Sequence, residues 1–464
     1  MPNSLYTKDT IAAVATPFGI AGIGIIRISG DKAAKIVEKI FNPKHPAEKF
    51  ESHHLYLGEI RDPSSGDTLD QVLLSFMKAP HSYTKEDVVE INTHSGHFLL
   101  QKILQVVLDA GARLAKPGEF TYRAFLNGRI DLTQAEAVVD LVHTKSEKGL
   151  LMASRQITGA LRERIEQLKE TVMDILAHVE VAIDFPEDEP GVLPREETGS
   201  RIEKEIVEPI ADIIAAHARR RQWMDGIHTV IAGRVNVGKS SLLNRLLNEQ
   251  RAIVTPIPGT TRDVIESFID LGGVPLRLMD TAGIRKVKGQ VEKMGVELTE
   301  RKLVEADLVL IMIDQSRALS QDDIHIISKS NKEKSLIILN KTDLPCKLDE
   351  IKLNKVLKDF VQIRISALTG EGIENLIAAI RDMILKRDED IISSPITPNL
   401  RHQRALIEAS QFFQTATHNT RDNAPPEIIA VDLHSGLEVL GTITGETHDE
   451  EIYDKIFSEF CLGK

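Results

Sequence analysis

The residues with the clearest chemical meaning are the glycines, lysine and serine of Gly233-Arg-Val-Asn-Val-Gly-Lys-Ser240. Glycines here let backbone N–H groups turn toward a bound phosphate, and a following helix N-terminus adds a fixed positive dipole. Lys239 would reach the β- and γ-phosphates, and the Ser240 hydroxyl would bind Mg²⁺. An apolar run precedes the segment and a helical pattern follows it, so a phosphate-binding loop is favoured over a simple glycine turn.

Two segments further along the chain would complete the phosphate and metal site. Thr261, within Gly259-Thr-Thr-Arg-Asp263, is the expected second Mg²⁺ ligand. Asp280 follows a strand pattern and would lie in the outer shell of the metal, while the Gly283 N–H would contact the γ-phosphate. Their order along the chain is that of a GTPase.

The segment Asn340-Lys-Thr-Asp343 would bind the nucleotide base. A carboxylate at Asp343 can accept the N1–H and N2–H pair that guanine offers and adenine lacks. Ser366 and Ala367 follow a further strand pattern and would form a loop beside the base. All these segments follow strands, so they predict a guanine-nucleotide domain with its site at the carboxyl edge of a parallel sheet.

The sequence departs from many GTPases at the position that orients the attacking water. Those enzymes place Gln directly after Asp-x-x-Gly, whereas this chain has Ile284. Two substitutes are compatible with the residues. One is a monovalent cation held by Asn236 and the loop 255–260; the other is a carboxylate among Glu292, Glu297 and Glu300. The residues alone leave both open.

Length and composition indicate a multidomain globular protein. A chain of 464 residues is expected to form two to four domains, and the hydrophobic share of 42% suffices for real cores. No apolar run approaches the roughly 20 residues that span a bilayer, and the start shows no secretory signal pattern. Cys346 and Cys461 are the only cysteines, which excludes a disulfide framework and fits a reducing cytoplasm.

The charge balance argues against a protein whose whole surface binds nucleic acid. The formal net charge is −12 and the pI is near 5.7. Local basic groups remain at 219–221, best explained as cations near a helix C-terminus, and at Lys116, Arg123 and Arg129. Any RNA-binding surface would have to be localised.

Patterning divides the chain into α/β and helical parts. Strand patterns begin at Ile11, Gly19, Asp70 and Asp87, and a helix is expected from Phe98 to Ala110. A capping box at Thr133–Glu136 predicts a long helix to about Gly159, followed by helical runs over 161–185 and 196–224. We expect an N-terminal α/β domain over 1–127, a helical domain over 128–224 and 389–464, and an inserted doubly wound, mostly parallel α/β GTPase domain over 225–388.

Three strings resemble the MnmE (TrmE) family of bacterial tRNA-modifying GTPases, within the TrmE-Era-EngA-like P-loop GTPases. They are Gly22-Ile-Gly-Ile-Ile-Arg-Ile-Ser-Gly30, Lys116-Pro-Gly-Glu-Phe-Thr-Tyr-Arg-Ala-Phe-Leu-Asn127 and the terminal Ile456-Phe-Ser-Glu-Phe-Cys-Leu-Gly-Lys464. The resemblance covers essentially the whole chain, and the terminal string is more specific than the GTPase motifs.

The resemblance implies that the N-terminal domain binds a tetrahydrofolate derivative, such as 5-formyltetrahydrofolate, and forms a homodimer. The implied folate contacts are Arg27, Glu90, Arg129 and Lys464. Some relatives have Lys in place of Arg129, so the charge is kept there although the contact geometry differs. From the residues alone, Arg27 and Glu90 could equally be an ordinary ion pair.

The resemblance also implies that K⁺ replaces an arginine finger. Asn236, Thr255, Ile257 and Thr260 would hold the cation, Ser240 and Thr261 would bind Mg²⁺, and Glu292 would be the catalytic carboxylate of Val291-Glu292-Lys-Met-Gly295. The GTP-binding set is then Asn236, Val237, Gly238, Lys239, Ser240, Ser241, Thr255, Pro256, Ile257, Pro258, Gly259, Thr260, Thr261, Asp280, Thr281, Ala282, Gly283, Asn340, Lys341, Asp343, Ser366 and Ala367.

Family members act with a FAD-dependent partner protein, as heterotetramers or larger assemblies, and without a membrane. Together they attach an aminomethyl or carboxymethylaminomethyl group to C5 of the wobble uridine (position 34) of certain tRNAs. We expect the same here. Two alternatives are a ribosome-assembly GTPase switch, which would need a basic RNA-binding appendage, and a stand-alone folate-dependent aminomethyltransferase. Cys461 is interpreted as a small apolar residue near the folate pocket rather than a nucleophile, since nothing nearby in sequence would lower its pKa.

Overall fold

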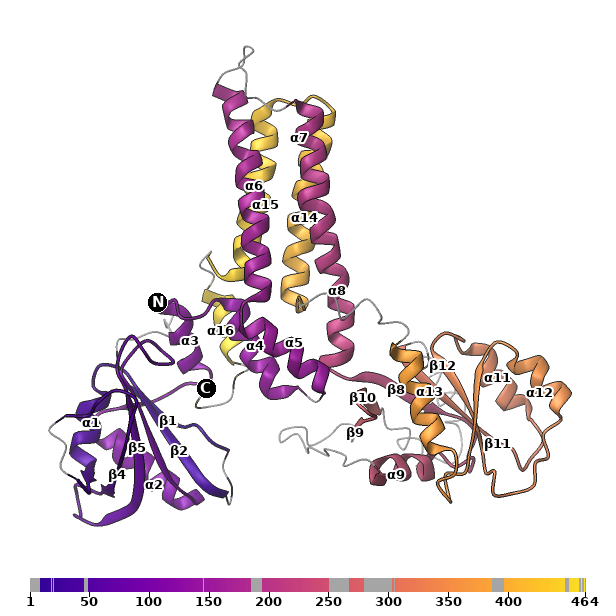
Figure 1. The fold of residues 1–464 in the computed structure, drawn as a ribbon, viewed down its shortest axis with the longest axis horizontal. Helices are drawn as coiled ribbons and strands as arrows, with labels where there is room; N and C mark the ends of the chain where they lie inside the picture. The colour runs from indigo at the N-terminus through magenta and orange to yellow at the C-terminus, as the bar shows by residue number, and fades with distance from the viewer. Residues whose placement is uncertain are drawn as a thin grey trace, which may run out of the picture. The chain divides into compact units, whose positions relative to one another are not determined.

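The structure is a computed structural model (Figure 1) that describes residues 9–17, 19, 21–45, 49–144, 146–184, 194–249, 267–278, 303, 305–385, 396–446, 450–458, 460 and 463. The chain divides into two compact units. One comprises Met1–Val139, Ile157–Glu203 and Gln411–Lys464, and the other comprises Asp140–Gln156 and Lys204–Ser410.

The first unit contains a seven-stranded sheet with the order β3-β4-β5-β6-β2-β1-β7. Neighbouring strands are antiparallel except for β1 and β7, which are parallel. The strands are β1 (Ile11–Val14), β2 (Ala21–Ser29), β3 (Phe41–Pro43), β4 (His54–Arg61), β5 (Thr68–Met77), β6 (Val88–Ser95) and β7 (Arg113–Leu114). The strand patterns at Ile11, Gly19, Asp70 and Asp87 are confirmed.

Helices cover one face of this sheet. The apolar sides of α1 (Ala33–Ile40) and α2 (His97–Asp109) share a core with inward-facing strand residues such as Ile26 and Ile91. Alternation along the strands sends the intervening residues to the other face. There Leu57 and Leu73 are cross-strand neighbours and both are exposed.

The capping box predicted at Thr133 is wrong by two residues, because the helix is capped at Asp131. Asp131 caps α4 (Leu132–His143): its Oδ1 accepts the Gln134 N–H at 3.0 Å, and Gln134 Oε1 accepts the Asp131 N–H at 3.0 Å. A carboxylate and a glutamine therefore play the reciprocal roles assigned to Thr133 and Glu136.

The long helix expected to run to Gly159 is also two helices. Ser146 Oγ accepts the Gly149 N–H at 2.9 Å and so caps a new helix, α5 (Glu147–Ile157). The same Ser146 hydroxyl donates to the Trp223 carbonyl oxygen at 2.9 Å, a contact distant in sequence. The periodic apolar pattern carried no sign of this break.

The remaining helical parts follow the predicted runs. In the first unit α6 (Ala160–Asp184) packs along α15 (Pro426–Thr444), which ends at the left-handed Gly445. The run over 196–224 is helical with a π-helical turn, η1 (Ile202–Val207), between α7 (Arg195–Arg201) and α8 (Glu208–Met224). The last helices are α14 (Leu400–Arg421) and α16 (Glu450–Ser458).

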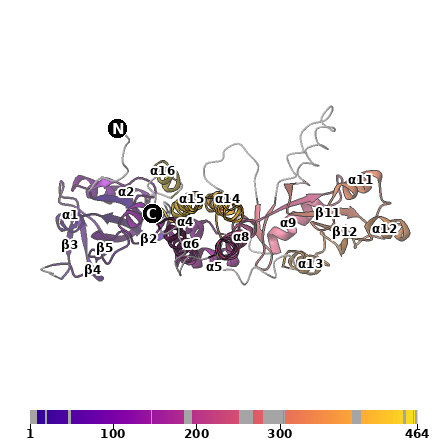
Figure 2. The ribbon, with the colours of Figure 1, turned by 90° about the horizontal axis from the view of Figure 1, so that it is seen from above.

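The second unit contains a six-stranded sheet with the order β13-β12-β11-β8-β10-β9, parallel except for the β9–β10 pair. Figure 2 shows helices on both of its faces, and two separate cores place α9 and α13 on one face and α11 and α12 on the other. This is the predicted doubly wound architecture. Its elements are β8 (Ile227–Ala232), α9 (Lys239–Glu249), β9 (Ser267–Asp270), β10 (Pro275–Leu278), β11 (Leu308–Asp314), α11 (Gln321–Lys329), β12 (Ser335–Asn340), α12 (Glu350–Leu357), β13 (Val361–Ile365) and α13 (Ile373–Leu385).

None of the described helices combines the length and apolar character needed to cross a membrane.

Candidate functional site

The glycine loop, residues 233–240, connects the end of β8 to the first turn of α9. Gly233 and Gly238 have φ angles of 138° and 107°, which favour glycine, and a Cβ at Gly238 would overlap the Asn340 side chain. Asn236 is also left-handed, with φ 65°. The backbone therefore has the conformation that lets consecutive N–H groups line an anion site at a helix N-terminus.

The Lys239 side chain folds back onto this loop and binds two of its carbonyl oxygens. Its Nζ donates hydrogen bonds to the carbonyl oxygens of Gly233 at 2.6 Å and Arg234 at 2.7 Å. Burial lowers the pKa of the Lys239 ammonium below its usual value. A partly desolvated cation interacts more strongly with a phosphate than one in water.

The base loop, residues 340–343, is joined to the glycine loop by Asn340. Its Nδ2 donates to the Val237 carbonyl at 2.7 Å, and its Oδ1 accepts the Ala367 N–H at 2.9 Å. Asp343 accepts a hydrogen bond from Ser366 Oγ at 2.6 Å, which fixes the carboxylate that we expect to bind guanine. The structure thus brings together three of the predicted nucleotide segments.

Two described residues match the donor types expected for metal ions. Ser240 lies in the first turn of α9 and Asn236 is exposed in the glycine loop, so both offer oxygen donors of the kind that hard cations prefer. No cluster of three His, Cys, Asp or Glu side chains that could hold a metal occurs among the described residues. An amide, a hydroxyl and a nucleotide phosphate would form a different kind of site.

Several predicted residues lie outside the described part of the chain. They are Thr255, Pro256, Ile257, Pro258, Gly259, Thr260, Thr261, Asp280, Thr281, Ala282, Gly283, Glu292, Cys461 and Lys464.

In the first unit, the predicted folate residues Arg27 and Glu90 are cross-strand partners on β2 and β6. Arg27 Nε donates to Glu90 Oε1 at 2.8 Å, with 23% of each side chain exposed. They belong to the sheet face that α1 and α2 leave uncovered. Arg27 Nη1 also donates to the Gly463 carbonyl at 3.4 Å, so the end of the chain reaches this pair.

Aromatic packing brings the chain end here. Tyr122 of α3 (Glu119–Leu126) meets Phe457 of α16 edge-on, with ring centroids 4.9 Å apart, and Phe460 stacks on Phe457 at 5.4 Å. Beyond them Gly463 has φ 91° and lies so close to Val14 that a Cβ would overlap the Val14 carbonyl. The specific terminal string thus has a structural role that its residues alone did not reveal.

Tyr83 was not predicted, yet it connects Arg27 and Arg129. Each guanidinium lies over the Tyr83 ring, with Cζ-to-centroid distances of 5.8 Å for Arg27 and 5.7 Å for Arg129. The phenol shares a 3.0 Å hydrogen bond with Thr121 Oγ1, and burial raises its pKa. Arg129 Nη1 donates to the Ser82 carbonyl at 2.8 Å. No motif marks Tyr83, because its neighbours are distant in sequence.

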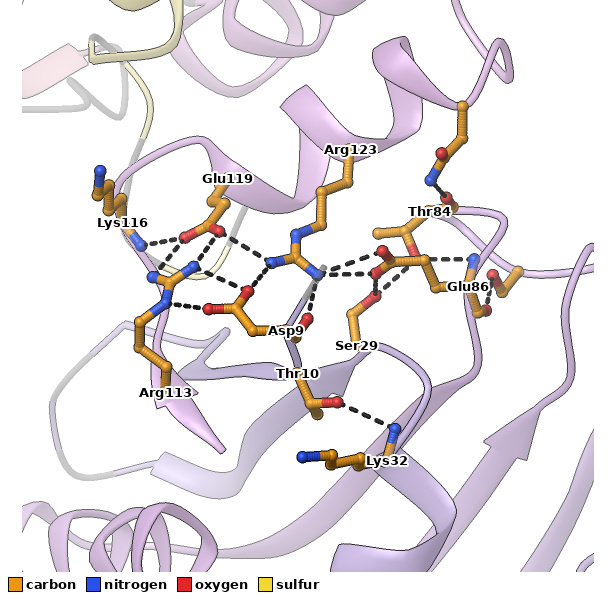
Figure 3. A network of polar contacts seen from close by, with 12 residues as sticks. Asp9, Thr10, Ser29, Lys32, Thr84, Glu86, Arg113, Lys116, Glu119 and Arg123 are labelled. Carbon is orange, nitrogen blue, oxygen red and sulfur yellow. Dashed lines mark hydrogen bonds and ion pairs between the residues drawn. The ribbon is translucent and has the colours of Figure 1, made fainter. Parts of the chain in front are cut away.

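A buried ionic network joins α3 to the residues before β1 (Figure 3). Arg123 is fully buried and donates to Asp9 Oδ1 at 2.7 Å, to Glu119 Oε1 at 3.1 Å and to Glu86 at 3.2 Å. Arg113 adds contacts of 2.6 Å to both Asp9 and Glu119. Of the local basic group Lys116, Arg123 and Arg129, Arg123 is therefore not on the surface, whereas Lys116 and Arg129 are exposed. Carboxylates neutralise Arg123, and the network fixes α3 against the start of β1.

A doubly wound sheet with a glycine loop and an Asn-Lys-Thr-Asp loop at its carboxyl edge defines a P-loop GTPase domain. Family models described as "GTP-binding protein TrmE N-terminus" and "MnmE helical domain" match residues 10–129 and 132–461. The chain belongs to the MnmE family of tRNA modification GTPases, and it is a GTP hydrolase.

Full-length relatives support the assignment to this family. The tRNA modification GTPase MnmE of Thermoanaerobacter pseudethanolicus is 45% identical over 98% of this chain and 99% of its own. That of Carboxydothermus hydrogenoformans is 45% identical over 98% of this chain and 100% of its own. The solved G domain of the T. maritima FeoB iron transporter overlaps 34% of this chain and 98% of its own, at 26% identity and a TM-score of 0.26.

Proposed function

We propose that this chain is a K⁺-dependent GTPase that acts with a FAD-dependent partner protein on tRNA. Together they would add an aminomethyl or carboxymethylaminomethyl group to C5 of the wobble uridine, using a one-carbon unit carried by a tetrahydrofolate. The observation that carries the proposal is that one chain of this family holds both the glycine and base loops and a cluster of Arg27, Glu90 and Arg129. In that cluster Arg27 pairs with Glu90, shares the Tyr83 ring with Arg129 and contacts Gly463 near the chain end.

The guanine-nucleotide half rests on the loops of the second unit. Backbone N–H groups of residues 233–240 and Lys239 would bind the phosphates, and Asp343 would select guanine. Asn236 would help to hold K⁺ and Ser240 to hold Mg²⁺, the other proposed ligands being Thr255, Ile257, Thr260 and Thr261. Bound K⁺ would supply positive charge beside the transferring phosphate. Glu292 is our proposed catalytic carboxylate.

The folate half rests on the uncovered sheet face of the first unit. Glu90 offers a carboxylate acceptor, and Arg27, Arg129 and Lys464 offer cations, which suits a ligand with both a donor-rich ring and carboxylates. A bound folate would supply the one-carbon unit. Exposed Leu57 and Leu73 on the same face support the proposal that it pairs with a second copy of the chain. We place the protein in the cytoplasm, where tRNA is modified.

The potassium dependence has a direct test. Because Ile284 stands where many GTPases have Gln, hydrolysis should need K⁺, and the smaller Na⁺ should not fit the same set of oxygen ligands. We predict that replacing K⁺ with Na⁺ at equal ionic strength slows GTP hydrolysis by about two orders of magnitude or more, as expected when one preorganised charge is lost. Nucleotide affinity in the two salts is the control. Equal rates in both salts would contradict the cation role.

A further inference from the structure

Asp314 is a buried carboxylate beside the proposed base site that the function above does not use. It ends β11 and is 8% exposed. The parallel register of β11 and β12 places Asp314 directly opposite Asn340, the first residue of the base loop. The next residue of that loop, Lys341, therefore lies within reach of the Asp314 carboxylate.

The contact between Asp314 and Lys341 is short and well supported. Lys341 Nζ lies 2.6 Å from Asp314 Oδ2. The other oxygen, Oδ1, accepts hydrogen bonds from the backbone N–H of Ser316 at 3.0 Å and from its hydroxyl at 2.6 Å. Ser316 thus fixes one oxygen of the carboxylate, and the other oxygen contacts Lys341. Arg317 approaches Oδ2 only to 3.7 Å, and its side chain is largely exposed.

The backbone of Lys341 is also held by this turn. Its φ is 71°, in the left-handed region that a residue with a long side chain rarely adopts. Gln315 Nε2 donates to the Lys341 carbonyl at 3.3 Å, and the Gln315 N–H donates to the Asn340 carbonyl at 3.1 Å. The turn after β11 therefore holds both the backbone and the side-chain end of Lys341.

The electrostatics agree with the geometry. Hydrogen bonds from Lys341 and Ser316 outweigh the effect of burial and keep the pKa of Asp314 below its usual value. The carboxylate is consequently charged at neutral pH, and a half-buried ion pair of this kind is stronger than one in open solvent.

We propose that Asp314 is a positioning residue for guanine-nucleotide binding. It holds the Lys341 side chain extended along the edge of the sheet, so that its aliphatic part forms a preformed wall for the base. This rests on the proposed base site at 340–343. Asp314 itself would not touch the nucleotide, and its effect would pass through Lys341.

The test is the dissociation rate of a fluorescent GDP analogue from Asp314→Asn. The amide oxygen can still accept from Ser316, so the turn is kept while the charge partner of Lys341 is lost. We expect dissociation about tenfold faster, with kcat at saturating GTP within about twofold, because a lost buried charge partner acts mainly on release. Asp359→Asn, which removes an exposed partner of Lys332 at 3.8 Å in the same domain, is the matched control and should leave dissociation unchanged.

A second set of variants, made in Lys341→Met, distinguishes a positioning role of Asp314 from a general contribution to the stability of the fold. In Lys341→Met, adding Asp314→Asn should change dissociation by less than about twofold, because the shared contact is already gone. An equal loss in both backgrounds, or an unchanged rate in Asp314→Asn alone, would overturn the proposal. If Asp314→Asn does not fold, Lys341→Met removes the same ion pair from its other end and should also speed dissociation, so a wild-type rate there would equally contradict the proposal. Failure of the wild-type chain to bind the analogue would instead refute the base site itself.

Discussion

At the scale of single residues, the chain separates groups that would bind nucleotide from groups that hold them in place. Asn340 illustrates the second kind, because its amide joins the glycine loop to the loop containing Ala367. Asp343 has one carboxylate oxygen bound to Ser366 and is otherwise exposed. Its geometry is that of an acceptor ready for an external donor pair.

This geometry predicts how Asp343→Asn changes base preference. An amide presents a donor where the carboxylate presents an acceptor, so it should favour the C2 oxygen of xanthine over the amino group of guanine. We expect the preference for GTP over XTP to fall by about two orders of magnitude, the scale for leaving a buried polar group mismatched. Competition between the two nucleotides for the purified protein measures this. An unchanged preference would remove Asp343 from the base site.

Tyr83 provides a second test at this scale. If its ring holds Arg27 and Arg129 in place for an anionic ligand, Tyr83→Ala should weaken 5-formyltetrahydrofolate binding by about 1–2 kcal/mol, the range of a partly desolvated cation–π contact. Tyr83→Phe keeps the ring and loses only the hydrogen bond with Thr121, so it should bind nearly as the wild type. Titration calorimetry distinguishes the two. Equal losses would assign the effect to the hydroxyl, and no loss in either would exclude Tyr83.

At the scale of elements, local patterns predicted most strands and helices, but not the contacts that position the sites. The strand–loop–helix around residues 233–240 was readable because glycine spacing and apolar runs are local signals. The Asp131 cap was missed in favour of Thr133 since both residue types suit an N-cap. Arg123 was assigned to a surface because its partner Asp9 lies 114 residues away, and no local pattern reports such a contact.

The ionic network predicts a large stability difference between two arginines. Arg123→Met would remove the buried cation shared by Asp9, Glu86 and Glu119, and Arg113 would remain beside Asp9 and Glu119 alone. We expect a loss of about 3–5 kcal/mol, the usual cost of removing one partner from a buried pair. Arg61→Met breaks an exposed pair with Glu59 and should cost less than about 1 kcal/mol. Denaturant unfolding measures both, and similar losses would contradict a structural role for the network.

At the scale of the whole molecule, the chain carries a guanine-nucleotide domain in one compact unit and the proposed folate cluster in the other. The resemblance in sequence predicted a GTPase of the MnmE family, and the full-length relatives confirm the family. The structure also shows how residues near the end of the chain are attached to the first unit. The aromatic cluster on α16 and the contact with Arg27 bring Gly463 to β2, within the same unit.

The proposed function requires one chain to use both GTP and a folate to modify tRNA. The most direct measurement combines the purified chain, its flavoprotein partner, unmodified tRNA, K⁺ and a folate labelled with ¹³C in its one-carbon unit, followed by mass spectrometry of the wobble nucleoside. We predict that the label enters the C5 substituent with GTP, and that GDP in place of GTP or Arg27→Ala abolishes this. A modified uridine without label, or equal labelling with GDP, would contradict the account.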